Sequence, residues 1–224
     1  FFPPKQLDQN IITTLKKLHP DILALVEIDN GSIRTHKNEV LFFKHKLGFR
    51  YFAQKIKYPL TSFISHVPVL AHQENALFSK YKLQSITYHQ FSEGVKRMVI
   101  EASVHCPKKV TLLLAHLSLG KRTRKKQIQE LITLVNTLKH PVILMGDFNT
   151  FCGPEELKQL LVQTHLRDVY HLHSYAKGCT FPSRHPDKRL DYVLVSPKIK
   201  IKNYEVLKYS FSDHRPVLVD FVVA

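Results

Sequence analysis

The chain has 224 residues, of which 44% are hydrophobic and 23% are charged, so it holds enough apolar material for the core of one ordinary domain. Its 7 glycines and 12 prolines are scattered, which excludes a collagenous or low-complexity protein. No apolar run approaches the roughly 18–20 residues that a membrane-spanning helix needs. Because no repeat and no Gly/Ser-rich linker divides the sequence, we expect residues 1–224 to form a single domain.

The charge balance favours a polyanionic partner. Lys and Arg number 33 against 18 Asp and Glu, which gives a formal net charge of +15. Such a surface attracts nucleic acid, anionic lipid headgroups or phosphorylated small molecules, although a basic surface can also serve solubility alone. The 3 cysteines form no CxxC motif, which is typical of a reduced, cytoplasmic protein. We expect a cytoplasmic monomer, while the start at Phe1 leaves open a processed or truncated N-terminus.

Helices and strands are mixed along the chain. Helical spacing of apolar residues predicts helices at 8–18, 37–47, 122–138 and 154–162. Compact apolar runs predict strands at 21–26, 49–53, 76–79, 95–104, 110–116, 142–145, 190–196, 199–207 and 216–222. Asp8 is the expected N-cap of the first helix, and Gly48 is expected at the C-terminal end of the second. The mixture predicts a layered α/β protein in which sheet packs on sheet and helices lie outside.

Acidic, amide and imidazole side chains stand at the ends of several of these strands. They are Glu27, His116, Asp147, Asn149, Asp191, Asp213 and His214. Singly, such residues more often form turns or helix caps than catalytic sites. Several carboxylates at one rim of a sheet repel one another unless a cation compensates, however, and Mg²⁺ takes such oxygen ligands. The pattern predicts a site for Mg²⁺ or a similar ion, since no cysteines are spaced for structural zinc.

Six segments together resemble the endonuclease/exonuclease/phosphatase superfamily, which includes deoxyribonuclease I, exonuclease III-type abasic-site endonucleases, neutral sphingomyelinases and inositol-polyphosphate phosphatases. In chain order they are DILALVE, NALFSK, HLSLG, GDFNT, RLDYVLVS and SDHRPV, between Asp21 and Val217. GDFN and SDH with LDY between them form a far more specific combination than any one motif. The chain looks most like a bacterial branch of this superfamily.

The resemblance implies a fold and a reaction. The fold is a four-layer α/β/β/α sandwich, in which two packed mixed β-sheets are flanked by helices. The reaction is hydrolysis of a phosphodiester with Mg²⁺ or Mn²⁺. By the same resemblance, Glu27 and Asp213 hold the metal ion, and Asp147 and Asn149 orient the attacking water and a phosphate oxygen.

The resemblance also implies roles for two histidines. His214 matches the histidine beside the scissile phosphate, and Asp191 matches the carboxylate that polarises it. His116 fits a second histidine of the deoxyribonuclease and sphingomyelinase branches, and Glu74 is the carboxylate expected to orient it. A carboxylate on His214 would hold its tautomer and stabilise the imidazolium, as in a hydrolytic triad.

The sequence departs from the family pattern in two places. The family begins with a strand whose end carries an Asn close to the metal, and nothing before Glu27 matches that strand, which puts the activity of this form in question. Val26 stands where many members have Gln, so one hydrogen bond next to the metal ligand is expected to be missing.

The basic segments favour nucleic acid as the substrate. The run 121–126, KRTRKK, follows HLSLG directly and is expected to contact phosphates beside the cut; the alternative is a solvated helical turn, whose positive charge opposes the helix dipole. Lys198, Lys200 and Lys202 form either a second basic stripe or the wet face of a strand. The chain has no Trp, unlike the abasic-site branch, and Phe181 is the expected substitute. Two alternatives stay open: hydrolysis of phospholipid, sphingomyelin or phosphoinositide, and an inactive basic binding protein.

Overall fold

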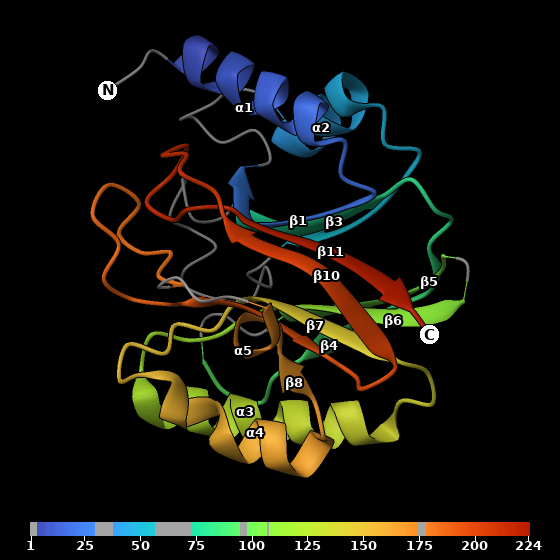
Figure 1. Ribbon diagram of the computed structural model, residues 1–224, viewed down its shortest axis with the longest axis vertical. Coiled ribbons are helices and arrows are strands. Elements are labelled where there is room, and N and C mark those ends of the chain that lie inside the picture. The colour runs from blue at the N-terminus through green and yellow to red at the C-terminus, as the bar shows by residue number, and fades with distance from the viewer. Residues whose placement is uncertain (1–3, 30–37, 57–72, 95–97, 107, 174–177) are drawn as a thin grey trace.

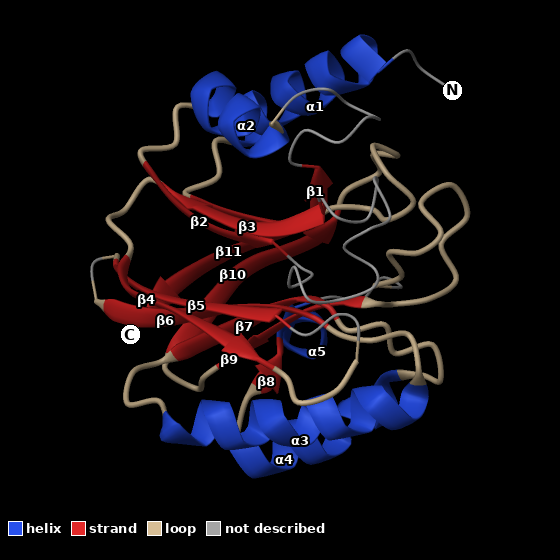
Figure 2. Ribbon diagram, turned by 180° about the vertical axis from the view of Figure 1, so that it is seen from behind, coloured by secondary structure: helices blue, strands red, loops and turns tan. Residues whose placement is uncertain are grey.

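The computed structural model describes residues 4–29, 38–56, 73–94, 98–106, 108–173 and 178–224 (Figures 1 and 2). Its helices are α1 (Pro4–Leu18), α2 (Glu39–Leu47), α3 (Lys121–Thr137), the 3₁₀ helix η3 (Pro154–Leu157), α4 (Lys158–Thr164) and α5 (Val169–His173). Its strands are β1 (Ile22–Asp29), β2 (Tyr51–Ile56), β3 (Gln73–Ser79), β4 (Gln84–Gln90), β5 (Met98–His105), β6 (Lys109–His116), β7 (Val142–Asp147), β8 (Arg167–Asp168), β9 (Asp191–Val195), β10 (Ile199–Val206) and β11 (Val217–Val223). None of the described helices combines the length and the apolar composition of a membrane span.

The elements form the four layers that the sequence predicts. Helices α1 and α2 cover one side and α3 and α4 the other, with the sheets between them (Figures 1 and 2). The six-stranded sheet has the order β4-β5-β6-β7-β9-β8, and it is mixed because β6 and β7 run parallel. The facing strands form two antiparallel ladders, β1-β3-β2 and β10-β11.

Three hydrophobic clusters fill the spaces between these layers. One joins the six-stranded sheet to α3 and α4, and includes Leu144 and Leu160. The second lies between the strand layers, where Leu77 of β3 shares a cluster with Leu112 of β6. The third packs α1 and α2 on β1 and β3. Strand β6 is thus buried on both faces, which explains why it reads as a continuous apolar run instead of alternating.

Several predicted boundaries change in the structure. Helix α1 begins at Pro4, so Asp8 lies inside the helix and is not its N-cap. The predicted helix 37–47 begins at Glu39 and is capped by Asn38, while Gly48 ends it in the left-handed conformation at φ 71° as expected. The predicted helix 154–162 is divided into η3 and α4. The start of the predicted strand 95–104 lies outside the described residues, and β5 is described from Met98.

Strand β4 was missed for a physical reason. Its sequence, QSITYHQ, contains two apolar side chains, and six of its seven residues are exposed to solvent. An edge strand with solvent on both faces has neither a continuous apolar run nor alternation. Its position is decided by the ladder that it forms with β5.

Candidate active site

Three neighbouring strands bring predicted site residues to one rim of the six-stranded sheet. Because β6 and β7 are parallel, their last residues, His116 and Asp147, are register partners. Strand β9 runs antiparallel to β7 and begins at this rim, where Asp191 is the partner of Asp147. Adjacent strands lie about 4.8 Å apart, so the three side chains belong to one site.

Asn149 is fixed against the end of β7. Its backbone N–H donates to Asp147 Oδ1 at 2.9 Å, and its side-chain Nδ2 donates to Asp147 Oδ2 at 3.1 Å and to the Leu117 carbonyl at 2.8 Å. Its backbone adopts φ 50°, a left-handed conformation that Asn tolerates better than most residues. These contacts hold the Asp147 carboxylate from two directions.

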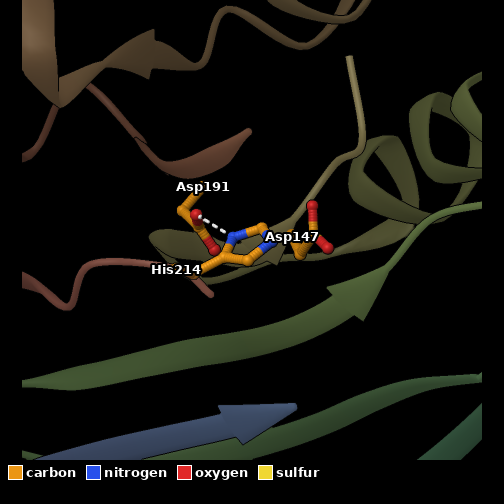
Figure 3. Close-up of side chains that lie close together, drawn as sticks. All are labelled: Asp147, Asp191 and His214. Carbon is orange, nitrogen blue, oxygen red and sulfur yellow. Dashed lines mark hydrogen bonds and ion pairs between the residues drawn. The ribbon is translucent and has the colours of Figure 1, made fainter. Parts of the chain in front are cut away.

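His214 comes from the loop before β11 and completes the group. Its Nδ1 lies 2.7 Å from Asp191 Oδ2, and its ring lies between Asp191 and Asp147 in Figure 3. Asp147, Asp191 and His214 place potential ligand atoms within 4.8 Å of one another. The loop is held by backbone bonds on either side, from Ser183 N to the Asp213 carbonyl at 2.7 Å and from Arg215 N to the Thr180 carbonyl at 2.8 Å.

These contacts shift the pKa values of His214, Asp147 and Asp191. Burial disfavours the charged form of His214, but the hydrogen bond and charge of Asp191 outweigh it and, with Asp147, raise the pKa of His214 to about 9. Burial also opposes ionisation of Asp147, yet His116, His214 and the Asn149 amide together lower the pKa of Asp147. Burial raises the pKa of Asp191, and the bond from His214 opposes that rise. At neutral pH, His214 is therefore an imidazolium beside the Asp147 carboxylate.

Glu27 approaches the same rim from the opposite strand layer. It has φ 57° and lies in β1 where the register with β3 shifts between Leu25 and Ile28. Such irregularities re-aim side chains. Glu27 Oε1 lies 3.9 Å from Nδ1 of His116, whose Nε2 lies 3.2 Å from Asp147 Oδ2. His116 is therefore placed between the Glu27 and Asp147 carboxylates.

Two predicted residues are less closely tied to this group. Glu74 is buried in β3 opposite Ile28, one residue beyond Glu27, and its role in orienting His116 stays a prediction. Asp213 is exposed next to His214, and its charge helps to raise the pKa of that histidine. The group whose ligand atoms lie within 4.8 Å of one another does not include Asp213 or Glu27. The expected role of these two carboxylates as the metal ligands therefore also stays a prediction.

The donor set fits a hard divalent cation better than zinc. Carboxylate oxygens predominate, and Glu27, with 41% of its side chain exposed, is accessible to an ion from solvent. His214 is a poor ligand, because its Nδ1 is bonded to Asp191 and its raised pKa keeps it protonated. Carboxylates at this rim are thus the residues that could hold Mg²⁺ or Mn²⁺, whereas His214 is suited to contact an anion.

Two further residues support the site: Thr180, for which no role was expected, and Phe181, which was expected only as a substitute for the missing Trp. Thr180 is fully buried, and its Oγ1 accepts from the backbone N–H groups of Leu190 at 3.3 Å and Asp191 at 3.4 Å, which fixes the start of β9. The ring of Phe181 lies 5.1 Å from the His214 ring. Both residues belong to the GCTFPS segment, whose nearness to His214 has no signal in sequence spacing.

The match to a family model decides the assignment. The model described as "Endonuclease/Exonuclease/phosphatase family" matches residues 4–214. The chain belongs to the endonuclease/exonuclease/phosphatase family. Members of this family are hydrolases that act on phosphoester bonds, on nucleic acids or on other substrates. The match thus confirms the family that the sequence motifs indicate.

Known relatives show how widely this family has diverged. UPF0294 protein VP2298 of Vibrio parahaemolyticus is 26% identical over 180 residues, which cover 76% of this chain and 53% of the relative, so the chain spans about half the length of that curated protein. An endonuclease/exonuclease/phosphatase from Beutenbergia cavernae superposes with a TM-score of 0.78 at 18% identity, covering 96% of this chain and 66% of that one.

Two further structures share the fold and differ in their described roles. The human Nocturnin catalytic domain, solved with a bound sulfate anion, has a TM-score of 0.75 at 21% identity. The superposition covers 100% of this chain and 88% of the Nocturnin chain. The mannosyl-6-phosphatase Bt3783 of Bacteroides thetaiotaomicron also has a TM-score of 0.75, at 19% identity, covering 97% and 91%. At these identities, the likeness establishes the fold of the endonuclease/exonuclease/phosphatase family and leaves the substrate open.

Proposed function

We propose that this chain is a divalent-metal-dependent phosphodiesterase whose substrate is nucleic acid. The observation that carries the proposal is the pairing of opposite charges at one rim. His214, held by Asp191 at 2.7 Å, has its pKa raised to about 9, and it lies beside the Asp147 carboxylate that Asn149 fixes. A phosphodiester requires a cationic group for its anionic oxygens and a base for the attacking water, and this rim supplies both.

The residues divide the reaction between them. In an in-line attack, the water oxygen forms a bond to phosphorus while the bond to the leaving oxygen breaks. Asp147 accepts the proton of the attacking water, Asn149 holds that carboxylate in place, and the His214 imidazolium donates a hydrogen bond to the developing negative charge. A Mg²⁺ or Mn²⁺ ion, for which Glu27 and Asp213 are the proposed ligands, would supply further charge neutralisation when bound.

The proposed preference for nucleic acid is supported by the start of α3. Lys121, Arg122 and Lys125 are exposed there, directly after the loop that leaves His116. Lys126 is also exposed and pairs with Glu93. Exposed cations beside a phosphoester site are suited to the phosphates on either side of the cut.

The test is hydrolysis of bis-p-nitrophenyl phosphate with Mg²⁺ or Mn²⁺. We expect activity that EDTA abolishes and that Asp147→Asn and His214→Gln each reduce by about 10²–10⁴, the usual range for a lost acid or base. Asp187→Asn removes an exposed carboxylate outside the site and serves as the matched control. Full activity in EDTA, or in Asp147→Asn, would contradict the proposal.

A substrate panel distinguishes the alternatives. Turnover of plasmid DNA, single-stranded RNA, sphingomyelin and phosphoinositides is compared with and without metal. Preferential cleavage of DNA or RNA supports the proposal, whereas preferential cleavage of a lipid replaces the substrate class. No turnover, together with Mn²⁺ binding that is absent from both the wild type and Glu27→Gln, would indicate an inactive binding protein.

A further inference from the structure

Arg124 does not have the role that its place in the basic run suggests. The sequence leaves residues 121–126 either as phosphate contacts or as a solvated helical turn, but the Arg124 side chain is only 1% exposed. Its Nε and Nη2 donate to the two carboxylate oxygens of Glu156, each at 2.9 Å, and its Nη1 donates to the carbonyls of Ser118 at 3.0 Å and Leu119 at 2.7 Å. All three guanidinium nitrogens are therefore occupied within the protein.

The two partners of this ion pair lie in helices, Arg124 in α3 and Glu156 in η3, and each binds a different loop of the site. Arg124 donates hydrogen bonds to the carbonyls of residues 118 and 119, which follow His116 at the end of β6. Glu156 Oε1 also accepts from the backbone N–H of Cys152 at 3.1 Å, in the loop that follows Asn149 and the end of β7. The pair thus joins the two segments that leave the parallel strands of the rim.

Further hydrogen bonds link these loops to the reacting groups. The carbonyl of Leu117, the residue before Ser118, accepts from Asn149 Nδ2 at 2.8 Å, and the Leu117 N–H donates to the Asp147 carbonyl at 2.9 Å. Gln127 also fixes Ser118, because its Oε1 accepts from Ser118 N at 2.9 Å. These bonds also fix the backbone of Asn149, which is in the left-handed conformation at φ 50°.

We propose that the Arg124–Glu156 ion pair positions Asn149 and Asp147 for the attack on phosphorus, and that Arg124 does not bind the substrate. The proposal rests on the proposed phosphodiesterase function. Arg124 and Glu156 are positioning residues, which act through the 117–120 and 149–153 loops. Lys cannot replace Arg here, because a single ammonium cannot bind a carboxylate bidentately and also reach two carbonyls in the same plane.

The first test separates positioning from substrate binding. In Arg124→Lys, kcat for bis-p-nitrophenyl phosphate is expected to fall at least about tenfold while KM changes less than about twofold, because small misplacements of reacting groups are costly. Val135→Ala, which trims the buried face of the same helix away from both loops, is the stability-matched control and retains its kcat when folded. An unchanged kcat in Arg124→Lys, or a loss confined to KM for DNA, overturns the proposal.

The second test does not depend on activity. Hydrogen exchange measured by mass spectrometry is expected to quicken at least about tenfold at 117–120 and 149–153 in Arg124→Lys, but not in Val135→Ala. Glu156→Gln must give the same result, and it replaces Arg124→Lys if that variant does not fold. If the wild type hydrolyses no substrate, the proposed function fails and this measurement still decides: loops that exchange at the wild-type rate overturn the positioning role.

Discussion

At the scale of single residues, the His214–Asp191 pair sets the response of the site to pH. The ordinary pKa of a histidine is about 6.5, and the pair raises that of His214 to about 9. Because the folded pKa exceeds the unfolded one, the stabilisation is complete below pH 6.5 and is lost as the pH rises through about 9. As the pH rises through this range, the free energy of unfolding and the fraction of His214 in the proposed imidazolium form therefore both decrease.

Asp191→Asn is predicted to remove the rise in the pKa of His214. Without the carboxylate, the pKa of His214 falls toward that of an ordinary histidine, and the alkaline limb of the pH–rate profile moves to lower pH by one unit or more. NMR titration of the His214 ring measures the pKa directly, and urea unfolding at pH 7 and pH 9.5 measures the loss of stability in the wild type. The control is Asp187→Asn, in which the titration stays at the wild-type value; a similar value in Asp191→Asn would refute the assigned cause.

At the scale of secondary-structure elements, the rim depends on how closely β6 and β7 approach. Gly146 lies in β7, opposite Ala115, with φ 137°. A Cβ at this glycine would lie in hard contact with the Ala115 carbonyl oxygen, which belongs to the backbone of the parallel strand and cannot rotate away. The residue before Asp147 therefore must be glycine for the two strand ends to meet.

Gly146→Ala is predicted to lower the free energy of unfolding by about 3 kcal/mol or more, because it combines overpacking with backbone strain. Gly153→Ala is the matched comparison: it also has a positive φ, of 104°, but its Cβ would meet no atom within 4 Å. That variant bears only conformational strain of about 1–3 kcal/mol. Urea denaturation compares the two, and equal losses would show that the close approach of the strands is not limiting.

At the scale of the whole molecule, the net charge of +15 predicts binding to nucleic acid that weakens steeply with salt. The exposed cations of the α3 start, Lys121, Arg122 and Lys125, are expected to carry much of this binding. Replacing all three by Ala should weaken DNA binding and reduce the salt slope by about one per lost phosphate contact, while turnover of bis-p-nitrophenyl phosphate is unchanged.

A second triple variant is the control for that experiment. Lys198, Lys200 and Lys202 are likewise exposed, on and beside β10. Replacing these three by Ala removes the same charge from another part of the surface, and we expect a smaller effect on the salt slope in titrations of fluorescent DNA. Equal effects of the two triple variants would show that binding follows net charge and not a defined surface.

The sequence by itself determined the class of fold and the identities of the residues at the rim. Buried strands such as β6 and β7 need apolar residues on both faces, so their ends are visible as abrupt changes to His116 and Asp147. The order of the six motifs then indicated the family that the 4–214 match confirms.

Only the tertiary structure decided what those side chains contact. Arg124 reads as one more cation of a basic run. Its burial depends on Glu156, which is 32 positions away and is brought close by the packing of the helices that carry the two residues. Glu27 faces His116 because β1 is irregular at that point, a feature of its pairing with β3. Local sequence encodes the periodicity of each element, whereas charge pairing between elements follows from their packing, and this is why the positioning contacts had no signal in the sequence.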